Sequence, residues 1–305
     1  MPTKKFKLLV PILVLSGFFV FLGESLAPPR GYRMKKPPEL EAKLELFKKE
    51  YLVREPIWVK VQVTNVGEEE GDFYFMTSDR LTIKDSKGKV YPCNIFVEYM
   101  GPVTIKPHET LENGFEVTGS YGLPEHRFAK RFPNRWWWYL PPNKYTVYYE
   151  LSYLLKKSVK SPVDSFEVLE PKGGKIKAMN LLVDSYDLLT ERKVEGALGR
   201  LDELIRQYPK SVYLPFAWSS KINIYRIYLE DWARSLSTCI ELIERYPHSQ
   251  EAIAAVKIMT AIYQTQKDKN GFLKAMNDLI KKYPNSDISK EAEKQLKQVK
   301  DKDFK

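Results

Sequence analysis

Hydrophobic and polar side chains alternate with a period of two through much of residues 39–170. Every second residue of LEAKLEL is apolar, and PIWVKVQVTN continues the same pattern after a short break. The apolar set is Leu40, Ala42, Leu44, Leu46, Ile57, Val59, Val61 and Val63. Successive side chains of a strand point to opposite faces, so one face of each segment is buried. The pattern predicts half-buried antiparallel strands.

Further short strands are predicted between turn sequences. We expect them at residues 72–76, 80–84, 89–97, 112–118, 144–152 and 163–169. Turn-forming residues separate the strands, as in Asp85-Ser86-Lys87-Gly88. Seven or more short strands without a helical pattern indicate an all-β immunoglobulin-like sandwich over residues 39–170.

Two stretches of this part resemble the immunoglobulin-like domains of exported bacterial proteins. Residues 51–59, YLVREPIWV, resemble the Gly-Glu-Pro phrase that precedes a strand in those domains, with Arg54 where glycine is usual. Residues 140–147, LPPNKYTV, resemble their Leu-x-Pro-Gly-x-Tyr-x-Val turn, with Asn143 in place of the glycine. Asparagine is the next best residue for a positive φ. The resemblance implies that the Tyr145 hydroxyl bonds back to the preceding turn.

The hydrophobic period becomes helical beyond residue 175. The composition of PKGG predicts a linker at residues 171–175. Apolar residues then recur at spacings of three and four. One such face holds Leu198, Leu201, Leu204 and Ile205, and another holds Leu236, Cys239, Leu242 and Ile243. We therefore predict that residues 176–305 are all-α, so that the chain is multidomain.

An internal repeat is the most specific signal in the chain. LIRQYPKS at residues 204–211 recurs as LIERYPHS at 242–249 and as LIKKYPNS at 279–286, with spacings of 38 and 37 residues. A unit of this length is a pair of helices that cannot bury its apolar face alone, so neighbouring units must stack. The proline of each copy is expected to end one helix, and the serine is expected to cap the next.

The match continues inside the units. An alanine lies eight residues after each repeat proline, at Ala217, Ala255 and Ala292. Together these residues resemble the long-period tetratricopeptide (TPR) repeat of bacterial envelope proteins such as the TolA-binding protein. The resemblance implies about three helix pairs followed by a capping helix. It also implies partner binding on the concave face formed by the first helix of each pair, where the candidates are Asn223, Arg226, Lys257 and Gln264.

Residues 1–27 have the layout of a secretory signal. Three lysines precede an apolar run over residues 8–23, and Ser25 and Ala27 are small residues at the positions that a signal peptidase reads. Pro28 disfavours cleavage after Ala27, so an uncleaved N-terminal membrane anchor is the alternative. Residues 28–38 form a basic, proline-rich stem. Both alternatives predict export to the periplasm or cell envelope.

The net charge of +10 is spread diffusely over the helical part, where residues 171–305 carry 24 basic and 18 acidic residues, and is focused in the short stem near Arg33. Such a surface favours anionic lipid head groups or acidic glycans, or is simply a solvated lysine-rich surface. No nucleic-acid partner is expected for an exported chain. The two cysteines, Cys93 and Cys239, are too few for a disulfide framework, and we expect single thiols rather than a bridge.

The sequence contains no recognisable catalytic, cofactor-binding or metal-binding motif. The three histidines are scattered without metal-ligand spacing, and no Walker A, GxSxG or GxGxxG motif is present. The carboxylates are expected on solvated faces rather than as a pair inside an apolar cleft. We therefore expect no catalytic residues, no cofactor and no enzyme activity.

A tryptophan-rich segment, RWWWY at residues 135–139, holds half of the six tryptophans. If the segment is extended, Trp136 and Trp138 point to one side and Trp137 to the other. The rings then pack inside the fold or form an exposed patch.

Three functions follow from these observations. The leading hypothesis is a non-enzymatic envelope scaffold that binds a partner protein through its repeats. The alternative is an exported glycan-binding or surface-binding module that uses Trp136, Trp137 and Trp138. A proteinase inhibitor is a third hypothesis, for which the sequence offers no reactive-loop motif.

Overall fold

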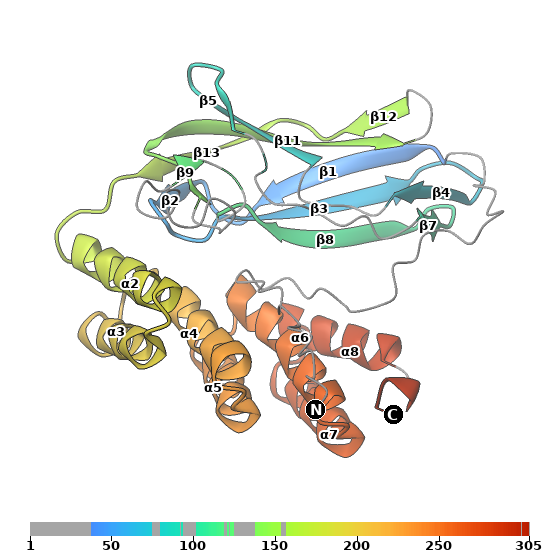
Figure 1. Ribbon diagram of the computed structural model, residues 1–305. Helices are drawn as coiled ribbons and strands as arrows, with labels where there is room; N and C mark the ends of the chain where they lie inside the picture. The colour runs from blue at the N-terminus through green and yellow to red at the C-terminus, as the bar shows by residue number, and fades with distance from the viewer. Residues whose placement is uncertain are drawn as a thin grey trace, which may run out of the picture.

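The computed structural model has a β region followed by a helical region (Figure 1). It describes residues 38–74, 80–91, 93, 102–118, 121, 123–124, 138–153, 157–299 and 301–304. The β region consists of the described residues up to 169, and the helical region consists of those from 174 onward. The predicted order of an all-β part and then an all-α part is confirmed.

The first sheet contains three antiparallel strands in the order β1-β3-β8. They are β1 (Leu40–Leu46), β3 (Trp58–Asn65) and β8 (Thr110–Glu116). In this register Leu46 lies opposite Val59, and Trp58 lies opposite Glu116. Trp58 and Glu116 therefore lie side by side at one end of the sheet.

The second sheet has the strand order β2-β13-β11-β5-β6, with β12 pairing β11. Its strands are β2 (Glu50–Leu52), β13 (Asp164–Leu169), β11 (Asn143–Tyr153), β5 (Leu81–Asp85), β6 (Val90–Tyr91) and β12 (Lys157–Lys160). Only the β2–β13 pair is parallel among these pairings.

Two small strand pairs complete the described β region. β4 (Gly71–Tyr74) pairs with β7 (Pro102–Ile105), and β9 (Leu123–Pro124) pairs with β10 (Trp138–Tyr139). The strand expected at 89–97 is described only as β6, and β2, β7, β9, β10 and β12 are additional to the sequence prediction.

The inward faces of both sheets share one hydrophobic core. Val59, Val61 and Val63 have no exposed surface, whereas the residues between them are partly exposed. The period-two pattern of this segment is thus confirmed by burial. On the second sheet, Tyr145 stacks on Phe166, with ring centroids 5.3 Å apart.

The two turns that resemble immunoglobulin-like sequences behave differently from each other. Arg54, which stands where glycine is usual, has a φ of +67°, so the backbone there does adopt a conformation that glycine favours. Asn143 does not have a positive φ, and its side chain instead accepts hydrogen bonds from Ser86 and from the Lys144 N–H. The Tyr145 hydroxyl donates to the Pro141 carbonyl at 2.6 Å, as expected.

The helical region contains seven α-helices in its described residues. They are α2 (Gly174–Thr190), α3 (Val194–Gln207), α4 (Leu214–Asn223), α5 (Trp232–Arg245), α6 (Gln250–Thr265), α7 (Lys269–Lys282) and α8 (Asp287–Gln298). A π-helical segment η2 (Ile224–Tyr228) continues α4, and a short 3₁₀ turn η3 (Asp301–Phe304) follows α8. Helix α2 begins inside the expected linker.

Each Tyr-Pro pair lies just beyond the end of a helix. Tyr208, Tyr246 and Tyr283 follow α3, α5 and α7, with ψ values of 59°, 54° and 57°. These values lie outside the helical range because a proline disfavours α conformation in the residue before it. The expectation that the repeat prolines end helices is confirmed.

The serines of the repeat cap two of the three following helices. Ser249 accepts from the Ala252 N–H at the start of α6, and Ser286 accepts from the Ser289 N–H at the start of α8. Ser211 does not cap α4, because its hydroxyl accepts from the Tyr213 N–H before the helix begins. The capping prediction is therefore wrong for the first copy.

A second repeated turn lies between the two helices of each pair. Arg192, Glu230 and Lys267 have φ values of 61°, 51° and 58°, and their spacings are 38 and 37 residues. Left-handed residues of this kind end helices by letting the following N–H groups bond to the last turn. After Lys267, the Asp268 N–H bonds to the Tyr263 carbonyl, and its carboxylate caps α7 through the Gly271 N–H.

The extra residue of the 38-residue unit lies in the π-helical segment. Pro209 and Glu230 are 21 residues apart, whereas Pro247 and Lys267 are 20 apart, so the insertion is in the first helix. A π-helical turn is the way in which a helix takes up one added residue. Segment η2 is therefore the structural counterpart of the longer spacing.

Small residues allow the helices to approach one another closely. Ala217, Ala255 and Ala292 have no exposed surface, and the α5 and α6 residues Cys239 and Ala252 are equally buried. The repeat alanines are thus core residues of the helical region.

No helix of the described part has the length and apolar character needed to cross a membrane. The segment at residues 1–27 and nearly all of the stem lie outside the described residues. Cys93 is half-buried and Cys239 is buried, and the two do not form a disulfide with each other in the described structure.

Candidate functional site

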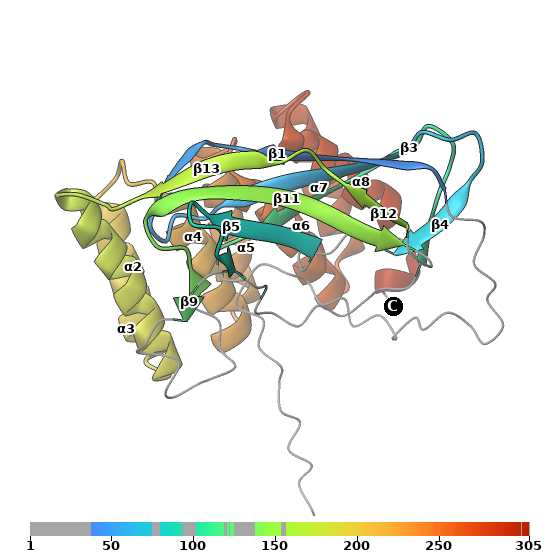
Figure 2. The same cartoon turned by 90° about the horizontal axis from the view of Figure 1, so that it is seen from above.

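The helical region packs against the outward face of β3 and β8 (Figure 1), and Figure 2 shows the strands lying over the helices. The fully buried Tyr213, at the start of α4, donates its hydroxyl to the Val53 carbonyl at 2.7 Å. Met179 of α2 contacts the cores of both regions. At the end of β3 and β8 that holds Trp58 and Glu116, the outward face, which sequence patterning assigns to solvent, is an interface inside the molecule.

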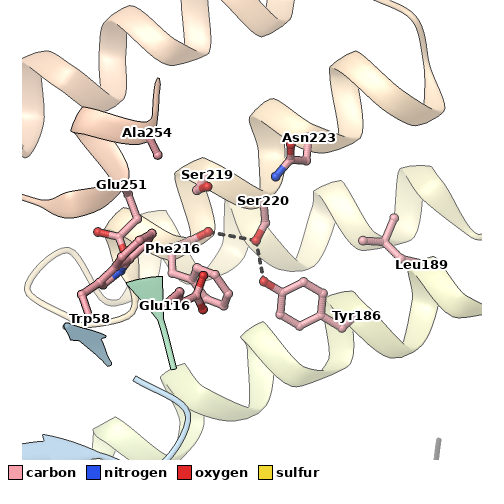
Figure 3. A pocket seen from close by; sticks show the side chains of 10 residues that line it. All are labelled: Trp58, Glu116, Tyr186, Leu189, Phe216, Ser219, Ser220, Asn223, Glu251 and Ala254. Carbon is pink, nitrogen blue, oxygen red and sulfur yellow. Dashed lines mark hydrogen bonds between the residues drawn. The ribbon is translucent and has the colours of Figure 1, made fainter. Parts of the chain in front are cut away.

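A small cavity lies within this interface (Figure 3). Its volume is about 20 Å³, which is room for about one water molecule. The β region and three helices contribute ten described residues, Trp58, Glu116, Tyr186, Leu189, Phe216, Ser219, Ser220, Asn223, Glu251 and Ala254. We call this space the junction cavity.

Glu251 reaches the junction cavity from the first turn of α6. Its Oε1 accepts a hydrogen bond of 3.1 Å from the Trp58 indole N–H. Burial raises the pKa of the Glu251 carboxyl, and the Trp58 hydrogen bond and the positive charge of Lys48 partly offset that effect. A helix N-terminus also favours negative charge, so this carboxyl has several groups that stabilise its anion.

Glu116 enters the junction cavity from the end of β8 and is only 6% exposed. Burial raises the pKa of its carboxyl to about 8, and the charge of Glu251 adds to the shift. Among the described residues no side chain or backbone group forms a hydrogen bond with this carboxyl. Glu116 is therefore protonated at neutral pH.

Two hydroxyl groups form a buried pair beside the acids. The Tyr186 hydroxyl of α2 lies 2.6 Å from Ser220 Oγ of α4. Ser220 Oγ also donates to the Phe216 carbonyl at 2.9 Å, so its own proton is used and the tyrosine is the donor of the pair. Burial raises the pKa of Tyr186 above its usual value. Neither hydroxyl is an activated nucleophile.

The four candidates on the first helices are only partly brought together. Asn223 is 6% exposed and lines the junction cavity, so its amide does not face open solvent. Arg226 donates from Nη2 to Asn223 Oδ1 at 3.2 Å, and burial lowers the pKa of its guanidinium. Lys257 Nζ lies 4.0 Å from Glu291 Oε2 of α8, and burial lowers its pKa. Gln264 is half-buried near the end of α6.

The tryptophan-rich segment contributes little to the described structure. Trp136 and Trp137 lie outside the described residues. Trp138 is described only through its backbone, which pairs with Pro124 in the small β9–β10 pair. The hypotheses of a packed or an exposed tryptophan cluster stay predictions.

Sequence reasoning missed the residues of the junction cavity. The carboxylates were expected on solvated faces, but Glu116 and Glu251 are 6% and 7% exposed. The expectation is wrong for these two because the face of the sheet that carries Glu116 is covered by helices. The one available signal was Trp58, a large aromatic residue on the polar side of its strand.

The described residues contain no group of three or more His, Cys, Asp or Glu side chains that could hold a metal ion. The functional groups that line the junction cavity are a pair of carboxyls and several neutral hydrogen-bonding groups. These groups can bind protons and form hydrogen bonds.

No protein-family model matches the chain, and no curated protein matches it. Solved structures similar to it include a β-glucosidase from Listeria innocua in complex with glucose. The two chains are 18% identical with a TM-score of 0.28, and the match covers 44% of this chain and 16% of the β-glucosidase chain. The sporulation control protein Spo0M from Bacillus subtilis has 14% identity and a TM-score of 0.26 over 50% and 56% of the two chains.

A β-glucosidase from Erythrobacter marinus gives 14% identity and a TM-score of 0.27 over 43% of this chain and 15% of that chain. The chain thus spans less than a fifth of the length of these β-glucosidases. Similarities of this size assign neither a fold family nor an activity.

Proposed function

We propose that the protein is a non-enzymatic scaffold of the cell envelope whose helical repeats bind a partner protein. The observation that supports this function most directly is the regular helical array. Three successive helix pairs share the same Tyr-Pro ends and the same left-handed turns, and the helix after each Tyr-Pro pair carries a buried alanine. Stacked pairs of this kind create extended surfaces suited to binding another chain.

The finer interpretation of each region belongs to the same proposal. The positive φ at Arg54 and the Tyr145–Pro141 hydrogen bond favour an immunoglobulin-like sandwich for the β region. The repeat spacing and the buried alanines favour TPR-like helix pairs. In this interpretation the β region holds the array at one fixed orientation, because buried contacts such as Tyr213–Val53 join the two regions.

The partner surface is proposed on the first helices. Arg226 and Gln264 are the residues that directly follow the equivalent tyrosines Tyr225 and Tyr263, so they occupy the same repeat position. Both are partly exposed, as is Lys257. Two cations and an amide on neighbouring helices suit a partner segment that carries carboxylates.

Export is the third part of the proposal. It rests on the basic start, apolar run and small residues of positions 1–27. An exported chain with a repeat array would meet its partner in the periplasm or at a membrane surface. A cleaved signal and an uncleaved anchor are both compatible with this function.

Site-specific photocrosslinking in cells tests the proposed function. A photoreactive residue at Gln264 should give a discrete crosslink to one envelope protein, identified by mass spectrometry. The same residue at Asn277, which is exposed on the second helix α7, is the matched control and should give none. Substituting Lys257→Ala should reduce the crosslink from position 264, whereas Lys274→Ala on α7 should not.

Two results would contradict the proposal. One is the absence of a crosslinked protein from position 264 at normal expression levels. The other is an identical set of products from positions 264 and 277, because a partner bound to the first helices cannot contact both surfaces equally.

A further inference from the structure

The junction cavity has an unusual charge composition. Two of its ten described lining residues, Glu116 and Glu251, are carboxylic acids, and none is a lysine, arginine or histidine. Both acids are more than nine-tenths buried. Two like charges in a shared, poorly solvated space cannot both be present without a large energetic penalty, so such pairs hold a proton between them.

The surroundings of the two acids differ in a way that locates the proton. Glu251 has the Trp58 N–H as a hydrogen-bond donor and lies in the first turn of α6. Glu116 has no hydrogen-bond partner among the described residues, although it faces the same space (Figure 3). The donors therefore stabilise the anion of Glu251, and the proton belongs on Glu116.

We propose that Glu116 and Glu251 hold one proton between them, and that loss of this proton weakens the contact between the first sheet and helix α6. The acids are on opposite sides of the interface, one on β8 and one on α6. Repulsion between two charged carboxylates consequently acts to separate the β region from the helical region. The contact between the first sheet and α6 is therefore sensitive to pH within the proposed scaffold.

The other ionisable groups around the pair are few. Helix α2 contributes the Tyr186 phenol, which stays neutral because burial raises its pKa. Helix α4 contributes only the neutral groups of Phe216, Ser219, Ser220 and Asn223. From the segment between β1 and β3, Lys48 lowers and Glu55 raises the pKa of Glu251, and these two residues form an ion pair with each other.

The direction of the pH effect follows from the pKa of Glu116. Burial raises that pKa to about 8 in the folded protein from 4.5 for a free carboxyl. The folded state therefore binds one more proton than the unfolded state between these values. The contribution of Glu116 to stability is therefore greatest below about pH 4.5, falls as the pH rises, and is lost above about pH 8.

The experiment compares the full-length protein with Glu116→Gln and Glu112→Gln by urea unfolding between pH 5 and pH 9. In the wild type the unfolding equilibrium constant should increase by up to about tenfold per pH unit between pH 5 and pH 8 from this one group. Glu116→Gln should remove that dependence and should be the more stable protein at pH 8.

Glu112→Gln is a matched control because Glu112 lies on the same strand as Glu116, four residues earlier and on the same face. Burial tends to raise the pKa of Glu112, but hydrogen bonds from Gln62 and Lys60 outweigh it and leave the pKa lowered. Glu112 is then ionised in both states above pH 5, and its substitution should leave the pH dependence unchanged.

Local hydrogen exchange distinguishes loosening of the contact between the first sheet and α6 from a general loss of stability. Hydrogen exchange of peptides that contain Trp58 or Ala252 should become at least about tenfold faster at pH 8.5 than at pH 6, after correction for intrinsic exchange. The peptide around Cys239, inside the helical core, should change less. Glu251→Gln removes the charge that adds to the Glu116 shift, so it should weaken the pH dependence but not abolish it, and this keeps the test available if Glu116→Gln does not fold.

Three outcomes would overturn the proposal. The first is an unchanged pH dependence of unfolding in folded Glu116→Gln or Glu251→Gln. The second is acceleration of exchange that is equal at Trp58, Ala252 and Cys239. The third is stabilisation by added Ca²⁺ or Mg²⁺ that Glu116→Gln abolishes, because a metal ion rather than a proton would then neutralise the pair.

Discussion

Tyr213 and Glu251 are each the fourth residue after a repeat proline, and each one contacts the β region. The Tyr213 hydroxyl bonds to the Val53 carbonyl, and the Glu251 carboxylate bonds to the Trp58 indole. One position of the repeat therefore has the same role in two successive units. The N-terminal ends of α4 and α6 therefore both lie at the interface with the β region.

Replacing Tyr213 with phenylalanine should destabilise the whole chain. The variant leaves the Val53 carbonyl without its buried donor, which costs about 1–3 kcal/mol in the free energy of unfolding. Tyr208→Phe is the control, since the Tyr208 hydroxyl has no hydrogen-bond partner among the described residues and is half-buried. Urea titration measures both, and equal losses would show that the Tyr213–Val53 bond does not stabilise the interface.

Replacing Trp58 with phenylalanine should destabilise the protein in a pH-dependent way. The proposed pair places its negative charge on Glu251 at pH 7, so the variant should lose a hydrogen bond to a charged carboxylate, which is worth about 2 kcal/mol. Below the raised pKa of Glu251 the acceptor is neutral, so the loss should shrink to about 1 kcal/mol. Unfolding at pH 4 and pH 7 gives the two values.

Trp232→Phe is the comparison for Trp58→Phe. Trp232 is half-buried at the start of α5, and its indole N–H bonds to no described residue. Substitution of Trp232 should lower the free energy of unfolding by the same amount at pH 4 and at pH 7. A pH-independent loss in Trp58→Phe would mean that Glu251 is not charged when it accepts the bond.

The periodic segments were predictable because a single physical rule sets their pattern. Val59, Val61 and Val63 alternate with polar residues since one face of β3 packs on the core. The ends of the helices were predictable from Tyr-Pro, because proline restricts the residue before it regardless of its surroundings. These features depend on local chemistry, which the sequence carries directly.

The junction cavity was not predictable, because it depends on how two regions pack. Trp58 and Glu116 lie on the face of the sheet that alternation assigns to solvent. This face becomes an interface only because α4 and α6 pack against it. Glu251 follows a serine cap and is explained locally as a first-turn acid, so nothing near it in the sequence indicates a buried partner.

The left-handed turns were missed for a different reason. Arg192, Glu230 and Lys267 occupy positions where glycine is the usual signal, and none of them is glycine. Their spacing of 38 and 37 residues equals that of the Tyr-Pro repeat, but three different side-chain types at these positions give no sign of a shared turn. Structure was needed to identify the second turn of the repeat.

Substituting Glu230→Gly should stabilise the protein. Glu230 is exposed with a φ of +51°, where a side chain is strained and glycine is not, so a gain of about 0.5–1 kcal/mol is expected. Glu241→Gly, also exposed but inside helix α5, should cost about 1 kcal/mol. Urea unfolding of both variants checks the opposite signs. A loss of stability in Glu230→Gly would show that the turn prefers the glutamate.

Deleting Leu229 should be tolerated, because the first helix of its unit contains one residue more than the equivalent helix of the next unit. The deletion shortens the Pro209–Glu230 interval to that between Pro247 and Lys267, and η2 should become an ordinary α-helical turn. Helix α6 contains no such extra residue, so deleting Thr265 shortens it below the repeat length. The deletion rotates the following chain by about 100° and should unfold the repeat. Thermal unfolding should therefore separate the two deletions by well over 10 °C, since the second disrupts a buried interface of several kcal/mol. Equal melting temperatures would show that η2 does not accommodate the added residue.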